Sequence, residues 1–380
     1  MSLIDNPLNL DEHLKQRKVL STVSRSSLFD IWEASPQGKK LDAVIRFLKL
    51  RFSAGKISSG EFIQFGFCNP KIDFSEQSKF AGKQAQQAFN LIYNDKTWYA
   101  ATKHKMLFET VMKGAGIACP DTIAIYDRKG RGAGAPILKS RKELEAFMRE
   151  GDNFPIFAKP TTGLLSIGSF RIDEIKGEYL LINGTHLMPV AEVCDYIHGI
   201  SLKGYLFQKV LKPHAKMVAL NGEAIASARF LIFNFEEKTF LHSCVLKLPA
   251  PGEVADNFWR TGSILCDIDC DSGEVIRACH KYEERVVEIK GDDVLYEKTM
   301  SFKVPNFDKA KQIVMQAARH FAGIKVQSWD VAFTHEGPVL LEVNYGGDLN
   351  LTQLASKKGV MSEEYCDLLR KSGYQGRLPK

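Results

Sequence analysis

The segment SWDVAFTHEGPVLLEVN, residues 328–344, is predicted to form a strand hairpin. Its side chains include hard oxygen ligands, and this combination decides the fold assignment. Two apolar runs flank a turn at residues 337–338, a Gly-Pro pair that suits a hairpin. Side chains alternate along a strand, so Glu342 and Asn344 share a face, and Asp330 on the partner strand is placed to lie opposite them. Carboxylate and amide oxygens are ligands that Mg²⁺ prefers. The segment therefore predicts a magnesium site at Asp330, Glu342 and Asn344.

A second motif lies upstream, where FPIFAKP at residues 154–160 is followed by TTGLLSIGS at residues 161–169. A lysine inside an apolar strand is costly to desolvate unless an anion meets it, and a small-residue loop offers backbone N–H groups to phosphate oxygens. Together they predict a phosphate clamp. The alternative is that Lys159 extends its ammonium group to solvent from an edge strand. The residues predicted to form the clamp are Lys159, Gly163, Ser166 and Gly168.

Composition predicts a folded protein with more than one unit. The chain has 380 residues, of which 44% are apolar and 25% charged, which excludes disordered and collagen-like proteins. The net charge of +6 is dispersed, so we expect no nucleic-acid partner. The first residues lack the order of a signal peptide, and no apolar run is long enough to span a bilayer. We therefore expect a cytoplasmic protein without a membrane span.

The pattern of apolar residues predicts an α+β fold behind a helical N-terminal region. Residues 1 to about 100 are predicted to be helical, and one helix there carries a stripe that we expect to face the core. From about residue 122, short apolar runs alternate with turn residues, which is typical of many short strands. Helices are predicted at 103–113, from Ser140 and at 308–322. The stripe consists of Leu41, Val44, Ile45, Leu48 and Phe52.

The order of these motifs resembles the ATP-grasp superfamily, in which a lysine, a strand lysine with a small-residue loop, a hinge and a D…E-x-N metal site follow one another. Lys105 stands where D-alanine ligases carry their first ATP-contacting lysine, and QKV at residues 208–210 resembles the hinge whose backbone meets adenine. From about residue 100 to 350 the motifs resemble, in order, those of the sugar-transfer-associated ATP-grasp family. They include LFQKVLKPH, SARFLIFN, VADNFWRTGSI and DIDCDSGEV.

This resemblance implies an ATP-grasp fold with two α+β lobes that sandwich ATP. It implies a helical region at 1–100, a first lobe at 101–205 and a second lobe at 206–380. It also implies roles for further residues. Those implied to bind ATP are Lys105, Gln208, Lys209, Val210 and His214, the last near the ribose. Those implied to hold phosphate or acyl phosphate are Arg229 and Lys247, while the family's Asp-Asn pair matches Asp256 and Asn257.

One departure from the D-alanine ligases concerns charge at the reaction centre. They carry an arginine two residues before the metal aspartate, where this chain has Ser328. Either Arg229 or Arg260 supplies the charge instead, or the chemistry differs.

The expected activity is that of an ATP- and Mg²⁺-dependent carboxylate–amine ligase, whose substrates would be a carboxylate acceptor and an amine or ammonia. The family is often linked with surface polysaccharides, so we expect the amide to be formed in the biosynthesis of a surface polysaccharide or sugar conjugate. An ATP-grasp kinase that phosphorylates a hydroxyl, with Asp256 as the candidate base, and a non-catalytic ATP-binding module stay open as alternatives. For residues 1 to about 100 three roles stay open: covering the nucleotide lobe, holding the substrate, or forming a homodimer contact.

Overall fold

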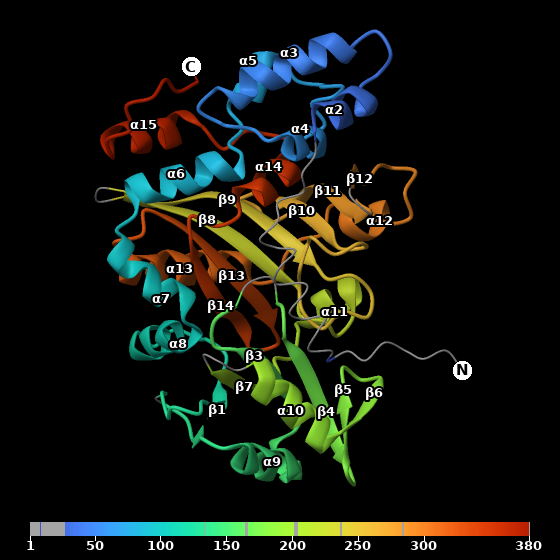
Figure 1. Ribbon diagram of the computed structural model, residues 1–380, viewed down its shortest axis with the longest axis vertical. Helices are drawn as coiled ribbons and strands as arrows, with labels where there is room; N and C mark the ends of the chain where they lie inside the picture. The colour runs from blue at the N-terminus through green and yellow to red at the C-terminus, as the bar shows by residue number, and fades with distance from the viewer. Residues whose placement is uncertain are drawn as a thin grey trace.

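The computed structural model describes residues 8, 27–132, 134–163, 166–200, 204–235, 238–282 and 285–379. The structure is built on two seven-stranded sheets. The first sheet lies toward one end of the molecule, and the second sheet lies above it and is covered by helices (Figure 1). This arrangement confirms the predicted α+β class with a helical N-terminal region.

The helices of the N-terminal half are α2 (Leu28–Ala34), α3 (Lys40–Arg51), α4 (Ser59–Gln64), α5 (Phe74–Ser78), α6 (Lys83–Tyr93), α7 (Tyr99–Lys103), α8 (Lys105–Gly114) and α9 (Arg141–Arg149). Those that follow are α10 (Val190–Ile200), α11 (Ala215–Asn221), α12 (Tyr296–Thr299), α13 (Phe307–Ala318), α14 (Leu349–Ser356) and α15 (Glu363–Lys371). Three short 3-10 helices lie at Lys96–Trp98, Gly151–Asn153 and Arg319–Phe321. The helices predicted at 103–113, from Ser140 and at 308–322 are confirmed, with ends that differ by a few residues.

The first sheet has the strand order β2-β1-β7-β3-β4-β5-β6. Its strands are β1 (Thr122–Tyr126), β2 (Ile137–Leu138), β3 (Ile156–Pro160), β4 (Phe170–Lys176), β5 (Tyr179–Ile182), β6 (His186–Pro189) and β7 (Tyr205–Lys209). Among the described strands of this sheet, β1 and β2 pair in parallel and the other neighbours pair antiparallel. Because β3 lies between β7 and β4, it is an interior strand. The chain leaves this sheet at Lys209, a few residues beyond the lobe boundary expected after residue 205.

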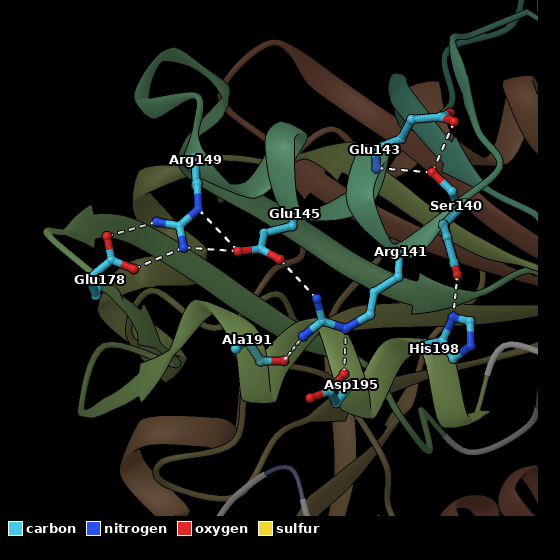
Figure 2. A network of polar contacts seen from close by, with 10 residues as sticks. Ser140, Arg141, Glu143, Glu145, Arg149, Glu178, Ala191, Asp195 and His198 are labelled. Carbon is cyan, nitrogen blue, oxygen red and sulfur yellow. Dashed lines mark hydrogen bonds and ion pairs between the residues drawn. The ribbon is translucent and has the colours of Figure 1, made fainter.

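Helices α9 and α10 pack on the first sheet, and ion pairs join them at the surface (Figure 2). Arg141 bonds Glu145 in its own helix and Asp195 in α10. Arg149 bonds Glu145 and also Glu178, in the turn between β4 and β5. Since these groups are largely exposed, water and salt screen the pairs, and the buried apolar side chains beneath them hold the helices in place.

The second sheet is entirely antiparallel in the order β12-β11-β10-β9-β8-β13-β14. Its strands are β8 (Ser227–Phe235), β9 (Lys238–Leu248), β10 (Ile264–Ile268), β11 (Val275–Tyr282), β12 (Arg285–Glu288), β13 (Val326–Thr334) and β14 (Gly337–Tyr345). The predicted hairpin is therefore confirmed as β13 and β14. Their register places Asp330 opposite Glu342 and Ser328 opposite Asn344, after a register shift between Asp330 and Val331. The turn lies at residues 335–336, so the Gly-Pro pair begins β14 rather than forming the turn.

The N-terminal helices share a core with the second sheet and α14. Phe47 and Leu50 of α3 belong to the same buried cluster as Val245 of β9 and Leu354 of α14. Hydrogen bonds reinforce this contact, because the side chain of Gln353 in α14 accepts one of 2.8 Å from the backbone N–H of Ala81 and donates another of 3.0 Å to its carbonyl. Residues 27–103 are thus part of the body that carries the second sheet (Figure 1).

The prediction that this stripe faces the core is wrong for four of its five residues. Leu41, Ile45, Leu48 and Phe52 are exposed, and only Val44 is half-buried against the core. Helix α3 packs instead through Ala43, Arg46, Phe47 and Leu50. The physical reason is that this helix carries apolar side chains on two opposite faces, so periodicity alone does not tell which face is buried. No helix in the described ranges combines the length and apolar character needed to cross a bilayer.

Candidate functional site

One face of the second sheet gathers charged side chains from four neighbouring strands. Arg229 lies on β8, Lys247 on β9, Asp330 on β13 and Glu342 on β14. Cross-strand neighbours point to the same face, and Asp330 is the register partner of both Arg229 and Glu342. Most other side chains on these strands are apolar and buried, so this row of charges interrupts an otherwise apolar sheet.

Asp330 is the centre of a buried ionic network. Arg229 donates hydrogen bonds of 2.7 and 2.8 Å to its two carboxylate oxygens, and the ammonium group of Lys247 lies 3.0 Å from Oδ2. Lys247 also pairs with Asp256 at 2.9 Å, and Asp256 accepts a hydrogen bond from the hydroxyl of Ser227. Burial alone would raise the pKa of Asp330, but the charges and hydrogen bonds of Arg229 and Lys247 outweigh it and hold the pKa well below its ordinary range.

Two lysines approach this row from the other side. Lys105 is the first residue of α8, and its Nζ lies 3.3 Å from the carbonyl oxygen of Gly163 and 3.9 Å from Oε2 of Glu342. Lys159 lies on β3, which the strand order places inside the first sheet, so the edge-strand alternative is excluded. Burial and the nearby charge of Lys105 lower the pKa of Lys159 to about 8.

Lys159 makes no hydrogen bond or ion pair with any residue in the described ranges, although the charge of Glu342 acts on it. A half-buried ammonium without a partner costs free energy unless an anion is bound beside it. Lys105 adds a second cation, and it stands at the first turn of a ten-residue helix, where the helix dipole also favours an anion. The two lysines therefore fit a polyphosphate.

The loop after β3 reaches toward the second sheet. The hydroxyl of Ser166 lies 3.4 Å from the carbonyl oxygen of Asp256, so this loop touches the segment that carries the buried network. Ser166 and Gly168 both adopt positive φ, at 56° and 76°, which turns the chain sharply between β3 and β4. Tyr205 of β7 donates a hydrogen bond to the carbonyl oxygen of Gly168 and fixes the end of the loop.

The predicted hinge lies at the end of β7, where Lys209 is the last strand residue and Val210 follows it. The side chain of Gln208 lies in a buried cluster of polar side chains. Its amide lies 3.1 Å from the hydroxyl of Thr122 and 3.4 Å from Glu109 of α8. The Gln208 side chain is therefore already engaged, and the backbone N–H of Lys209 donates a hydrogen bond of 2.9 Å to the carbonyl oxygen of Asp121.

His214 and Arg260, the remaining predicted residues, each contact other parts of the chain. His214 is the N-cap of α11, and its Nδ1 accepts a hydrogen bond of 3.1 Å from the backbone N–H of Lys216. Arg260 pairs with Glu253 in the loop before β10, and within the described residues it makes no hydrogen bond or ion pair with Arg229 or Asp330. Of the two arginines considered as the source of positive charge, only Arg229 lies at the centre.

The close approach of two chain segments restricts the space at Ser328. Ser328 is buried, and a Cβ atom added to Gly347 would lie 1.8 Å from its hydroxyl oxygen. Gly347 also has a φ of 57°, in the left-handed region that favours glycine. The turn after β14 thus closes over position 328 and leaves no room for a long side chain, while Arg229 places its guanidinium beside Asp330 from the neighbouring strand.

Glu342, Asn344 and Asp330 form the set of oxygen donors at this site. Glu342 is half-exposed, and its Oε1 accepts a hydrogen bond of 3.0 Å from the amide of Asn344, so the two side chains lie together as hard oxygen donors. Asp330 faces Glu342 across the hairpin, but its two oxygens already accept bonds from Arg229 and Lys247. Each carboxylate oxygen has two acceptor positions, so Asp330 retains capacity for a further partner. The three side chains fit a divalent cation bound mainly through Glu342 and Asn344.

Comparison with known protein families matches residues 84–366 to the sugar-transfer associated ATP-grasp family. The chain belongs to this family. Its fold is the ATP-grasp fold, and the match includes every predicted site residue from Lys105 to Asn344. No curated protein sequence matches this ATP-grasp chain significantly.

Solved structures similar to this ATP-grasp chain include three ligases and synthetases of low sequence identity. VanG D-Ala:D-Ser ligase from Enterococcus faecalis is 12% identical over 74% of this chain and 60% of its own, with a TM-score of 0.40. D-alanine–D-alanine ligase from Bacillus anthracis is 12% identical over 89% and 94%, with a TM-score of 0.43. N5-carboxyaminoimidazole ribonucleotide synthetase from Thermotoga maritima is 12% identical over 73% and 55%, with a TM-score of 0.36. The chain thus spans less than two thirds of VanG and of the synthetase.

Sequence reasoning missed the supports of the site. Glu109 and Thr122 hold Gln208, and Ser227 holds Asp256, yet none of the three supporting residues was predicted. Ser227 could have been predicted, because it lies two residues before Arg229 on the same strand and therefore shares its face. For Glu109 the chain gives no such signal, since α8 and β7 meet only in the folded protein.

Proposed function

We propose that this chain is an ATP- and Mg²⁺-dependent carboxylate–amine ligase. The observation that carries the proposal is the pair Lys105 and Lys159, which faces Glu342 and Asn344 across the boundary between the two sheets of an ATP-grasp fold. Cations on one side and hard oxygen donors on the other are what a metal-bound polyphosphate requires. The proposed lobes are residues 101–205 and 206–380, with 1–100 as the helical region.

In this proposal each group has a role that its position supports. Lys105, Lys159 and the loop residues Gly163, Ser166 and Gly168 bind phosphate oxygens, and the backbone of residues 208–210 meets adenine, with His214 near the ribose. Glu342, Asn344 and Asp330 hold Mg²⁺, which when bound withdraws charge from the phosphates. Arg229 and Lys247 steady negative charge at the reacting centre, whereas Arg260 lies aside in its pair with Glu253.

The proposed reaction joins two substrates through an acyl phosphate. A carboxylate oxygen attacks the γ-phosphorus of ATP, the bond to the β-phosphate oxygen breaks, and ADP leaves. The nitrogen of an amine or ammonia then attacks the acyl carbon, phosphate departs, and the nitrogen loses a proton as the amide forms. Phosphoryl transfer of this kind depends on positioning and charge and needs no protein nucleophile. The family's description as sugar-transfer associated suggests a sugar-linked acceptor.

The kinase alternative is less well supported. A hydroxyl acceptor usually needs a general base to take its proton. Asp256 was the candidate, but its carboxylate pairs with Lys247 at 2.9 Å and accepts a hydrogen bond from Ser227. A carboxylate acceptor arrives already ionised and needs no base, so the arrangement favours ligation.

Hydroxylamine trapping tests this proposal. The protein is incubated with MgATP, hydroxylamine and a panel of sugar acids and amino acids, and ADP release and hydroxamate are measured for each. We expect at least one acid to stimulate ADP release with an equal amount of hydroxamate, and Glu342→Gln to abolish both. Stimulated ADP release with a stable phosphate ester and no hydroxamate would establish a kinase instead. Mg²⁺-dependent ATP binding without turnover for any acceptor would indicate a non-catalytic module.

A further inference from the structure

The outer face of α3 carries an apolar stripe with no partner in the described part of the chain. Leu41, Ile45, Leu48 and Phe52 are spaced by four, three and four residues, so they fall on one side of the helix. Leu41 is 67% exposed and Phe52 is 85% exposed. The opposite side of the helix is buried, and α3 forms the end of the molecule farthest from the first sheet (Figure 1).

Side chains from two neighbouring helices extend the stripe. The ammonium of Lys40 lies 5.4 Å from the ring centre of Trp32 in α2, and that of Lys49 lies 5.7 Å from the ring of Phe74 in α5. Of the 17 large apolar side chains exposed in the described ranges, eight lie on these three helices or at the end of α3. We call them the α3 patch. It consists of Leu28, Phe29, Trp32, Leu41, Ile45, Leu48, Phe52 and Phe74.

Such a concentration needs an explanation, because an exposed apolar patch of this kind usually marks an interaction surface. The ATP-grasp match begins at residue 84, so the α3 patch lies outside the part of the chain that aligns with the family. The predicted site residues all lie within the match. The patch therefore belongs to a surface that ATP binding does not account for.

The stretch that carries α2 and α3 is unbalanced toward positive, whereas the α5 end of the patch carries Asp73 and Glu76 as well as Lys71 and Lys79. Residues 27–56 contain six basic and three acidic residues. Each acid is engaged locally: Asp30 caps α2, Glu33 lies 3.5 Å from Lys40, and Asp42 lies 2.8 Å from Arg46. Four cations are left without a carboxylate partner among the described residues. They are Lys39, Lys49, Arg51 and Lys56.

We propose that the α3 patch docks this protein on the surface of an anionic lipid bilayer. Leu, Phe and Trp side chains enter the boundary between headgroups and acyl chains, and surrounding lysines and arginines attract anionic headgroups. The helix would lie along the surface, in keeping with the absence of a spanning helix among the described residues. The first sheet, at the far end of the molecule, would face away from the lipid.

A second copy of this chain fits the patch less well. A two-fold dimer through the α3 patch would bring together the same four cations of both copies, which have no carboxylate partner among the described residues, and like charges at a desolvated contact repel. Anionic lipid supplies the complementary charge that a second copy lacks.

Vesicle flotation with the full-length protein tests the proposal, independently of ATP turnover. Vesicles of phosphatidylcholine and phosphatidylglycerol in equal amounts are compared with vesicles of phosphatidylcholine alone. We expect the protein to float with the anionic vesicles, to float less with the neutral ones, and to be released in part by high salt. The double variant Leu41→Gln with Phe52→Gln should weaken this binding at least about tenfold, because two large apolar side chains no longer enter the lipid.

Two further variants isolate the causes. Lys39→Glu with Lys49→Glu should also weaken binding at least about tenfold, through charge alone. Leu91→Gln with Val294→Gln removes two other apolar side chains, which are 56% and 92% exposed, and this variant should bind as the wild type does. Thermal unfolding of every variant shows whether it is folded.

Several outcomes would overturn the proposal. These are no flotation of the wild type with anionic vesicles, equal flotation with neutral vesicles, or unchanged flotation of the Leu41 and Phe52 variant. A dimer in sedimentation that this variant converts to a monomer, without vesicle binding by the wild type, would assign the patch to a contact between copies.

Discussion

Arg229 on β8 and Asp330 on β13 face each other and are joined by two hydrogen bonds of 2.7 and 2.8 Å. Both side chains are largely buried, and Lys247 adds a second cation to the same carboxylate. Asp330 thus has two roles to separate. It is a proposed ligand of Mg²⁺, and it also neutralises two buried cations. Glu342, which shares the first role, is half-exposed and does not have the second.

Asp330→Asn and Glu342→Gln should therefore differ in stability while agreeing in activity. Removing one partner of a buried ion pair leaves an uncompensated charge and costs about 3–5 kcal/mol. For Glu342→Gln we expect less than about 1 kcal/mol, because its partner Lys105 is 3.9 Å away at a partly exposed position. Both variants should lose Mg²⁺-dependent ADP release. Urea unfolding and an ADP assay measure the two effects.

The pH dependence of this difference provides a control. The pKa of Asp330 is lower in the folded than in the unfolded protein, so its contribution is fully present above the unfolded pKa of about 4 and is lost as the pH falls toward the folded value. The stability gap between wild type and Asp330→Asn should be constant from neutral pH to about pH 5 and shrink in stronger acid. Glu178→Gln, at an exposed ion pair with Arg149, should give no measurable gap. An Asp330→Asn variant as stable as the wild type would refute the structural role.

Lys159 should make ATP binding sensitive to alkali. Burial and the charge of Lys105 lower the pKa of Lys159 to about 8, so the free protein loses this positive charge as the pH rises through 8. If phosphate contacts require the charge, affinity for MgATP falls above pH 8, by up to about tenfold per pH unit. Calorimetry between pH 7 and pH 9.5 measures this, with adenosine as a ligand whose affinity should stay constant.

Two variants separate charge from packing at this position. The guanidinium of Lys159→Arg stays positively charged at all these pH values, so the affinity of this variant for MgATP should not fall above pH 8. Lys159→Ala should weaken MgATP binding throughout and adenosine binding little. Lys159→Ala also removes a buried positive charge that lowers the free energy of unfolding of the wild type. This destabilisation is present below pH 8 and disappears as the pH rises from 8 toward 10.5, the ordinary pKa of lysine. Equal weakening of both ligands by Lys159→Ala would show that Lys159 is structural.

Much of the site could be predicted because its motifs are local. The hairpin of β13 and β14 is indicated by two apolar runs on either side of a short turn, although the turn lies at residues 335–336 and Gly337-Pro338 begins β14. Simple alternation would pair Asp330 with Leu341, and the register shift between Asp330 and Val331 brings Asp330 opposite Glu342 instead. The interior position of β3 could not be predicted, since it depends on β7, whose pairing residues follow about 50 positions later. Nor could the burial of Asp330, which requires β8 and β9 to deliver Arg229 and Lys247 to the same face.

The wrong assignment on α3 has a different cause. Leu41, Ile45, Leu48 and Phe52 give a regular helical pattern, and so do the residues that are buried on the other side. A helix with two apolar faces shows the correct period but not the direction of the core. That direction is decided by α14 and β9, whose side chains pack against Phe47 and Leu50.

Ser328→Arg should destabilise the protein rather than restore the arginine of the D-alanine ligases. Position 328 is buried, and the turn at Gly347 closes over it. An unpaired guanidinium in this space would also repel Arg229. We expect a lower midpoint of thermal unfolding and no gain in ADP release, whereas Ser328→Ala, which removes one oxygen atom, should change the midpoint little. Retained stability together with faster turnover in Ser328→Arg would show that the space can open.

Gln208 should not tolerate replacement by glutamate, and the reason is Glu109. The carboxylate of Glu109 accepts a hydrogen bond of 3.1 Å from the backbone of Thr122 and one of 2.5 Å from its hydroxyl, and the amide of Gln208 lies 3.4 Å away. Both Glu109 and Gln208 are buried. Gln208→Glu would place a second carboxylate beside the first and remove a donor.

We expect Gln208→Glu to lower the free energy of unfolding by about 1–3 kcal/mol at pH 7, the cost of a buried group left without its partner. The loss should be smaller at pH 5, because one of two adjacent carboxylates then binds a proton in the folded state. The double variant Glu109→Gln with Gln208→Glu restores one amide and one carboxylate at this place, so it should recover much of the loss, and urea unfolding of all four proteins forms a double-mutant cycle. Additive effects of the two changes would show that Glu109 and Gln208 are not coupled.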